Sequence, residues 1–139
     1  MPVPTEQARY RRFRPAVRVA RATARDVAHR GGLSSLADEL ESVVGELVAN
    51  AVVHGRAAKG SQVLVTYRLA DEGIRVEVRD WATGTPRMRQ LADSGDATAE
   101  GGRGLAMVSA LSIRWGVNQR VIGKTVWCEL GAQRRTPDA

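Results

Sequence analysis

The chain has 139 residues, a length that suits one domain and leaves little room for a second independent core. Apolar residues make up 43% and charged residues 26%, which is typical of a globular protein and excludes a disordered, collagen-like or coiled-coil chain. The net charge of +6 permits binding to nucleic acid, to nucleotide phosphates or to an acidic protein surface. Cys128 is the only cysteine, so an internal disulfide is excluded, and a structural zinc site is effectively excluded as well.

No stretch approaches the roughly 20 apolar residues that cross a bilayer, and the first residues lack the apolar run of a signal peptide. We therefore expect a cytoplasmic protein with no membrane partner. Eight arginines fall within the first thirty residues, whereas residues 31–54 carry four acidic residues and no lysine or arginine. A solvated basic helix face is the simpler interpretation of these arginines, and a dedicated binding surface is the alternative.

The first half of the chain predicts a short strand and two helices. A strand is expected at Tyr10–Arg14, and a helix from Pro15 to Gly31–Gly32, because Pro suits a first helical position and Gly a helix end. Ser34 and Ser35 can cap a second helix that ends near His54–Gly55. Its apolar stripe recurs at helical spacing and consists of Leu36, Leu40, Val43, Val44, Leu47, Val48 and Ala51.

The second half predicts strands around one loop and one short helix. Apolar residues alternate over 63–69 and again over 74–78, and a turn at residues 71–73 joins the two runs as a hairpin. Residues 82–101 show neither period and are expected to form a mobile functional loop. A short helix opens at residues 101–104 and runs through Leu105 to Leu111. Two further strands follow, with alternation at 113–117 and 126–130 and a turn at Gly123–Lys124.

These elements predict an α+β fold with two layers, in which helices cover one face of a mixed, mostly antiparallel sheet. We expect a flexible N-terminus over residues 1–9, one domain over residues 10–131 and a flexible C-terminus over residues 132–139.

Three polar residues share a face of the second predicted helix. Glu46, Asn50 and His54 recur every four residues, and Glu46 and Asn50 flank the apolar stripe, so both should look into the edge of the core. A carboxylate and an amide in that place need partners. Asp80 is in phase with the inward residues of the 74–78 run, so its carboxylate should also point inward, where a ligand amine would meet it. An ordinary turn aspartate that caps the next segment is the alternative interpretation. Gly84 would let the backbone approach a flat ring closely.

Glycines 101, 102 and 104 precede a predicted helix, whose unpaired N–H groups and dipole favour phosphate. The two common phosphate motifs are not met. The dinucleotide fingerprint fails because Met107 occupies the position of its last glycine, and the segment Gly123-Lys124-Thr125 lacks the earlier glycine of a P-loop.

The chain resembles the GHKL ATPase superfamily of gyrase, Hsp90, histidine kinases and MutL, and three of its segments in combination carry the resemblance. The likeness extends from about residue 10 to 131 and rests on an N box, Glu46 to Gly55, on a first glycine box, Asp80 to Gly84, and on a second glycine box, Gly102-Arg103-Gly104-Leu105. The small size and the form ELVANAVVHG are most similar to the anti-sigma-factor serine kinase branch. That resemblance implies a two-layer ATP-binding fold of the Bergerat type.

The resemblance also implies roles for individual residues. Asn50 would coordinate Mg²⁺ that bridges the ATP phosphates, and Glu46 would act as general base or orient the attacking hydroxyl of a protein serine. Asp80 would recognise the adenine amine, with support from Thr125 on the last strand. Residues 85–101 would form a lid over ATP, and the phosphates would be lined by Gly102, Arg103, Gly104 and Leu105.

This chain departs from the family's first glycine box, because Ala82 stands where a glycine is usual and the bulky Trp81 would lie beside the base. The implied partners are a sigma factor, an anti-anti-sigma factor or both, and a homodimer is possible. A non-catalytic protein that sequesters a partner on the same scaffold is the alternative function. A nucleic-acid-binding domain is disfavoured, because only six aromatic residues are present.

Overall fold

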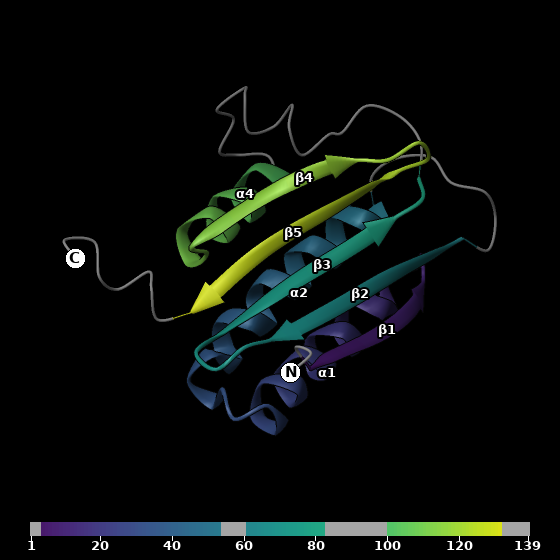
Figure 1. Cartoon of the computed structure of the whole chain (residues 1–139). Coiled ribbons are helices and arrows are strands. Elements are labelled where there is room, and N and C mark those ends of the chain that lie inside the picture. The colour runs from purple at the N-terminus through teal and green to yellow at the C-terminus, as the bar shows by residue number, and fades with distance from the viewer. Residues whose placement is uncertain (1–3, 54–60, 83–99, 132–139) are drawn as a thin grey trace.

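The computed structural model describes residues 4–53, 61–82 and 100–131. Within these ranges an antiparallel sheet of five strands forms one layer, and the helices form a second layer behind it (Figure 1). The strands are β1 (Thr5–Arg11), β2 (Gln62–Leu69), β3 (Gly73–Asp80), β4 (Arg114–Gln119) and β5 (Lys124–Gly131). Their order across the sheet is β1-β2-β3-β5-β4, and all four pairings are antiparallel. The predicted two-layer α+β fold is confirmed, although the expected mixture of strand directions is not found among the described strands.

The helices are α1 (Pro15–Arg30), α2 (Ala37–Val53) and α4 (Glu100–Leu111), with a short 3-10 turn η1 (Ser34–Leu36) before α2. Pro15 begins α1 and Gly31–Gly32 ends it, as predicted. The prediction that Ser34 and Ser35 cap this helix is wrong: both lie within η1, α2 begins only at Ala37, and the Ser34 hydroxyl lies 2.8 Å from His29 Nδ1. The predicted end of α2 at His54–Gly55 lies outside the described residues, as does most of the predicted loop 82–101.

Strand β1 begins at Thr5, five residues before the predicted start at Tyr10. Residues 5–9 therefore pair with β2, although we expected them to belong to a flexible N-terminus. The prediction was wrong because strand β1 is mostly polar and has no clear apolar alternation. Backbone hydrogen bonds to β2 hold these residues in a strand, and the local sequence does not reveal that pairing.

The core lies between the sheet and the helices. All seven residues of the predicted α2 stripe are buried, and they pack against the inward residues of β2, β3 and β5. Side chains on the other face of the sheet are covered by no described helix (Figure 1). That open face carries arginine–glutamate pairs and the Arg75 guanidinium, which stacks 4.1 Å from the centre of the Trp127 ring. None of the described helices is both long enough and apolar enough to span a bilayer.

The basic side of α1 is partly paired with the acidic start of α2. Arg25 Nη1 lies 2.6 Å from Asp38 Oδ1 and 2.8 Å from Glu41 Oε1, and Arg21 Nε lies 3.6 Å from Glu41 Oε2. These exposed pairs contribute little to stability individually. They show that part of the N-terminal positive charge serves helix–helix packing.

Cys128 gives an alkaline pH dependence that can be tested. Burial raises the pKa of its thiol from 9.0 to about 12. Between these values the unfolded chain ionises and the folded chain does not, so the free energy of unfolding falls as pH rises above 9. We expect the loss from this group to reach about 1.4 kcal/mol by pH 10.

Urea denaturation at pH 8 and pH 10 measures this loss, with Cys128→Val as the control variant. The stability difference between the wild-type chain and the variant should shift by about 1.4 kcal/mol between the two pH values. A difference that does not change with pH would show that the thiol titrates alike in both states. The buried Tyr67, whose pKa is also raised by burial, adds its own loss above pH 10.

Candidate functional site

The C-terminal part of α2 presents two of the predicted site residues. Asn50 is buried, with 6% of its surface exposed, and Glu46 lies one helical turn earlier and is half-buried. Both therefore lie at the edge of the core, as their spacing predicted. The Asn50 amide nitrogen is buried and has no hydrogen-bond partner within the described structure. A buried polar atom without a partner carries a free-energy cost, and a bound ligand would remove that cost.

Asp80 ends strand β3 and points to the helix side of the sheet. Only 2% of it is exposed, and it follows the inward residues Ile74, Val76 and Val78 in strict alternation. Its Oδ1 accepts a hydrogen bond of 2.8 Å from the backbone N–H of Ala82. That contact shapes the chain immediately after the strand, where Ala82 is itself buried. The predicted inward orientation of this carboxylate is confirmed.

Two cationic side chains that the sequence analysis missed meet this carboxylate. Arg12 Nε lies 3.5 Å from Asp80 Oδ1, and Lys124 Nζ lies 3.4 Å from Asp80 Oδ2. Both cations are largely buried, with 12% and 13% of their side chains exposed. Period-two alternation could have found them, because Arg12 follows the inward Tyr10 by two residues and Lys124 precedes the inward Val126 by two.

Arg12 also connects the two halves of the site. Its guanidinium donates a hydrogen bond to the carbonyl of Ala51, the residue that follows Asn50 on α2. The same side chain is paired with Asp80 at the end of β3. The C-terminal part of α2 and the end of β3 therefore lie together, at the same end of the two-layer sandwich (Figure 1). Arg12 holds them in this arrangement by charge and by hydrogen bonding.

Thr125 is not brought into this site. It pairs with Arg79 in the β3–β5 register, so it projects from the open face of the sheet, opposite to Asp80. There it accepts a hydrogen bond of 3.1 Å from Arg120 and lines a hollow of about 580 Å³. The expectation that Thr125 supports the same base as Asp80 is wrong, because adjacent residues of a strand point to opposite faces.

The expectation that the bulky Trp81 would lie beside the base is also wrong. Its ring lies on the open face, where the Arg79 guanidinium stacks 4.7 Å from the ring centre. It therefore does not occupy the space beside Asp80.

Some predicted residues are described only in part. Residues Gly102 to Leu105 lie within α4, which begins at Glu100, so the glycines stand inside the first turns of the helix and do not precede it. Only the N–H groups of the first turn lack a partner within a helix, so Gly101 and Gly102 keep this donor capacity, whereas the N–H groups of Gly104 and Leu105 lie beyond that turn. Phosphate binding by this segment stays a prediction. Gly84, His54 and residues 85–99 of the predicted lid lie outside the described residues.

Asn50 fits one ligand position of a magnesium ion. Mg²⁺ in phosphate sites keeps several waters and takes few protein ligands, so one amide oxygen and the phosphates suffice. Turning the Asn50 amide about its last bond exchanges oxygen and nitrogen, and this would put the oxygen where the unpartnered nitrogen lies. No group of three or more His, Cys, Asp or Glu side chains able to hold a metal occurs in the part of the chain described here.

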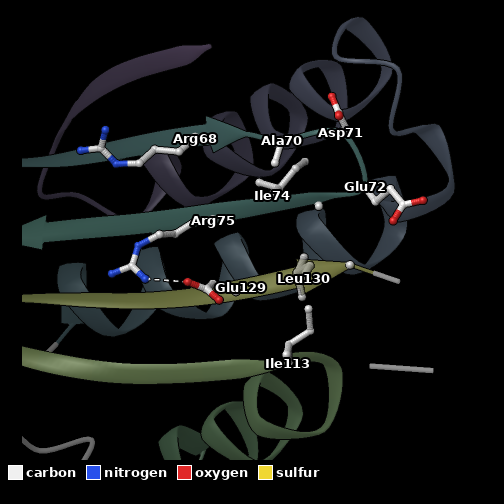
Figure 2. Close-up of a pocket in the computed structure, with 11 residues that line it drawn as sticks. Arg68, Ala70, Asp71, Glu72, Ile74, Arg75, Ile113, Glu129 and Leu130 are labelled. Carbon is white, nitrogen blue, oxygen red and sulfur yellow. Dashed lines mark hydrogen bonds and ion pairs between the residues drawn. The ribbon is translucent and has the colours of Figure 1, made fainter. Parts of the chain in front are cut away.

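A separate hollow of about 740 Å³ lies at the other end of strand β3. It is formed around the β2–β3 turn and the end of β5, and its lining includes Ile74 and Leu130 (Figure 2). Figure 2 also shows Arg75 paired with Glu129 at its edge, at 2.8 Å. Strand β3 separates this hollow from Asp80 by most of its length, so the two are distinct features.

The fold and the site together define the class of protein: it is a two-layer α+β domain with a candidate nucleotide site where α2 and β3 end. A family model described as the histidine kinase-like ATPase domain matches residues 8–129. The chain therefore belongs to the histidine kinase-like ATPase family, and ATP is the nucleotide expected for its domain. No curated protein sequence matches the chain significantly.

Proposed function

We propose that this protein is an ATP-binding regulatory protein, an anti-sigma factor that transfers phosphate from Mg-ATP to a serine or threonine of an anti-anti-sigma partner. The single observation that carries the proposal is the convergence of a buried Asn50, a half-buried Glu46 and a buried Asp80 at one end of the fold. A cytoplasmic location and a possible homodimer belong to the same proposal.

Each residue has one task in this scheme. Asp80 accepts a hydrogen bond from the adenine amine, and the first turn of α4 faces the phosphates through its unpaired N–H groups, with Gly102, Arg103, Gly104 and Leu105 lining the nucleotide. Asn50 would hold Mg²⁺, which supplies neutralisation of the phosphate charge. Residues 85–101 would close over the nucleotide and exclude water.

Glu46 takes the role of general base. The partner's hydroxyl oxygen forms a bond to the γ-phosphorus of ATP while its proton passes to the Glu46 carboxylate. The bond between the γ-phosphorus and the bridging oxygen breaks, and ADP leaves with the electron pair. A half-buried carboxylate suits this step, because it can reach a substrate and is partly shielded from water.

The test uses the full chain, labelled Mg-ATP and candidate anti-anti-sigma proteins encoded near its gene. Glu46→Gln should lower phosphate transfer by about 100-fold or more, because general bases contribute that much, and should leave ATP binding intact. Glu39→Gln is the matched control, since Glu39 is also half-buried but lies in the first turn of the same helix. Equal transfer by the wild-type chain and Glu46→Gln would contradict the proposal.

A second candidate is a non-catalytic protein that binds ATP or sequesters a partner on the same fold. One observation favours the form that sequesters a partner without ATP: Asp80 already has two cationic partners, so base binding must share this carboxylate with them. Stable partner binding without any phosphate transfer by the wild-type chain would select this function.

A further inference from the structure

Lys124 occupies a place beside Asp80 that the proposed function leaves without a role. The two residues are paired directly across strands β3 and β5, and both side chains face the helix layer. Lys124 Nζ lies 3.4 Å from Asp80 Oδ2, and the lysine side chain is only 13% exposed. An ammonium group this far from water needs polar partners, and the carboxylate is the one found for it among the described residues.

The hydrogen-bonding capacity of this pair is not used up. Among the described residues, Asp80 Oδ1 accepts the N–H of Ala82 and faces Arg12, whereas Lys124 is the one partner that Oδ2 has there. A carboxylate oxygen can accept two hydrogen bonds, and an ammonium group donates three and accepts none. Within the described ranges, the pair thus keeps one unused acceptor position on Oδ2 next to at least one unused donor on Nζ. An acceptor and a donor side by side form a recognition edge for a ligand with the complementary order.

Adenine has that complementary edge, because its exocyclic amine is a donor and the neighbouring ring nitrogen N1 is an acceptor. We propose that Lys124 is a specificity-determining residue, which donates a hydrogen bond to adenine N1 while Asp80 accepts one from the amine. This inference rests on the proposed function, since it assumes that the site binds ATP. Arg12 cannot serve in the same way, because its guanidinium is engaged with the Ala51 carbonyl and with Oδ1.

The arrangement also predicts discrimination between bases. Guanine carries an acceptor, O6, where adenine carries its amine, and a donor, N1–H, where adenine carries its acceptor. Guanine would therefore set O6 against the carboxylate and N1–H against the ammonium group, and both contacts are unfavourable. GTP should bind more weakly than ATP, and the ammonium group should contribute to that difference.

The experiment removes each hydrogen-bonding partner separately. ATP and its 1-deaza analogue, in which a C–H group replaces N1, are titrated calorimetrically into the wild-type chain and into Lys124→Met in magnesium buffer. Wild type should bind the analogue about 10-fold to 100-fold more weakly than ATP, as expected for a lost hydrogen bond to a charged group. Lys124→Met should bind ATP more weakly by a similar factor and should no longer distinguish the two nucleotides.

Two further variants control for folding and charge. Lys124→Gln keeps an N–H donor at this position and should restore part of the preference for ATP over the analogue. Arg114→Met removes an equally charged side chain from the open face, where it is 69% exposed, and should leave both affinities unchanged.

Three results would overturn the inference. If the analogue bound more weakly than ATP by the same factor in wild type and in Lys124→Met, Lys124 would not recognise N1. If Lys124→Met bound ATP more tightly than wild type, Lys124 would compete with the base for Asp80. Tighter binding of GTP than of ATP would contradict the match to adenine. Wild type that binds neither ATP nor the analogue would instead overturn the proposed function itself, and the inference with it.

Discussion

Replacing Asp80 by asparagine is expected to weaken ATP binding by a few kcal/mol at most, on the order of one hydrogen bond to a charged group. The amide keeps the shape of the carboxylate but carries one acceptor oxygen in place of two, and its NH₂ group would face the adenine amine or Lys124. Calorimetric titration of ATP measures the loss. Equal ATP affinity of both proteins would contradict the assignment of Asp80 to the base.

The same substitution is expected to lower the free energy of unfolding by about 3 kcal/mol, because it leaves two largely buried cations without their counter-charge. Arg12 and Lys124 lie 3.5 Å and 3.4 Å from the carboxylate, and neither side chain is more than 13% exposed. Urea denaturation measures this effect without nucleotide. Asp71→Asn, at an exposed position in the β2–β3 turn, is the control and should change neither stability nor ATP binding.

Replacing Gly123 by alanine is expected to destabilise the fold by at least about 2 kcal/mol and to disturb the site. Gly123 has a φ of +76°, a conformation that residues with a Cβ adopt at a cost. A Cβ there would also lie 1.9 Å from the Asp80 carbonyl oxygen and 2.7 Å from Trp81 Cα. Both contacts are to backbone, so the turn before Lys124 would have to move away from Asp80.

Gly32→Ala separates the two causes. Gly32 has nearly the same φ, +75°, but an added Cβ would meet nothing within 4 Å. Gly32→Ala should lower the free energy of unfolding by about 1 kcal/mol, which is the cost of placing a residue with a Cβ at this φ, and should leave ATP binding unchanged. Thermal or urea unfolding of both variants provides the comparison. Equal destabilisation would show that the close approach to the end of β3 contributes nothing.

The elements themselves were largely predictable from local patterns. The apolar stripe of α2, the proline start and glycine end of α1, and the β2–β3 hairpin all follow from periodicity and from turn residues near in sequence. Strand β1 was placed incorrectly because its polar sequence pairs with a strand more than fifty residues away. Long-range pairing of that kind leaves little local signal.

The candidate site also contains residues that local patterns predicted and residues that they did not. The buried positions of Asn50 and Asp80, and the half-buried position of Glu46, followed from helical and strand periods. Thr125 was assigned from motif resemblance without testing its strand phase, and the β3–β5 register places it on the other face. The positions of Gly84, His54 and the segment 85–99 stay predictions.

The sequence by itself determined which side chains point toward the helix layer, because side-chain direction depends only on the period of each element. Only the tertiary structure decided that Arg12 and Lys124 meet at Asp80. Those contacts join residues 68 and 44 positions apart, and their distances depend on how β1, β3 and β5 align across the sheet. Strand alignment is set by packing of the whole core, so no single segment encodes it.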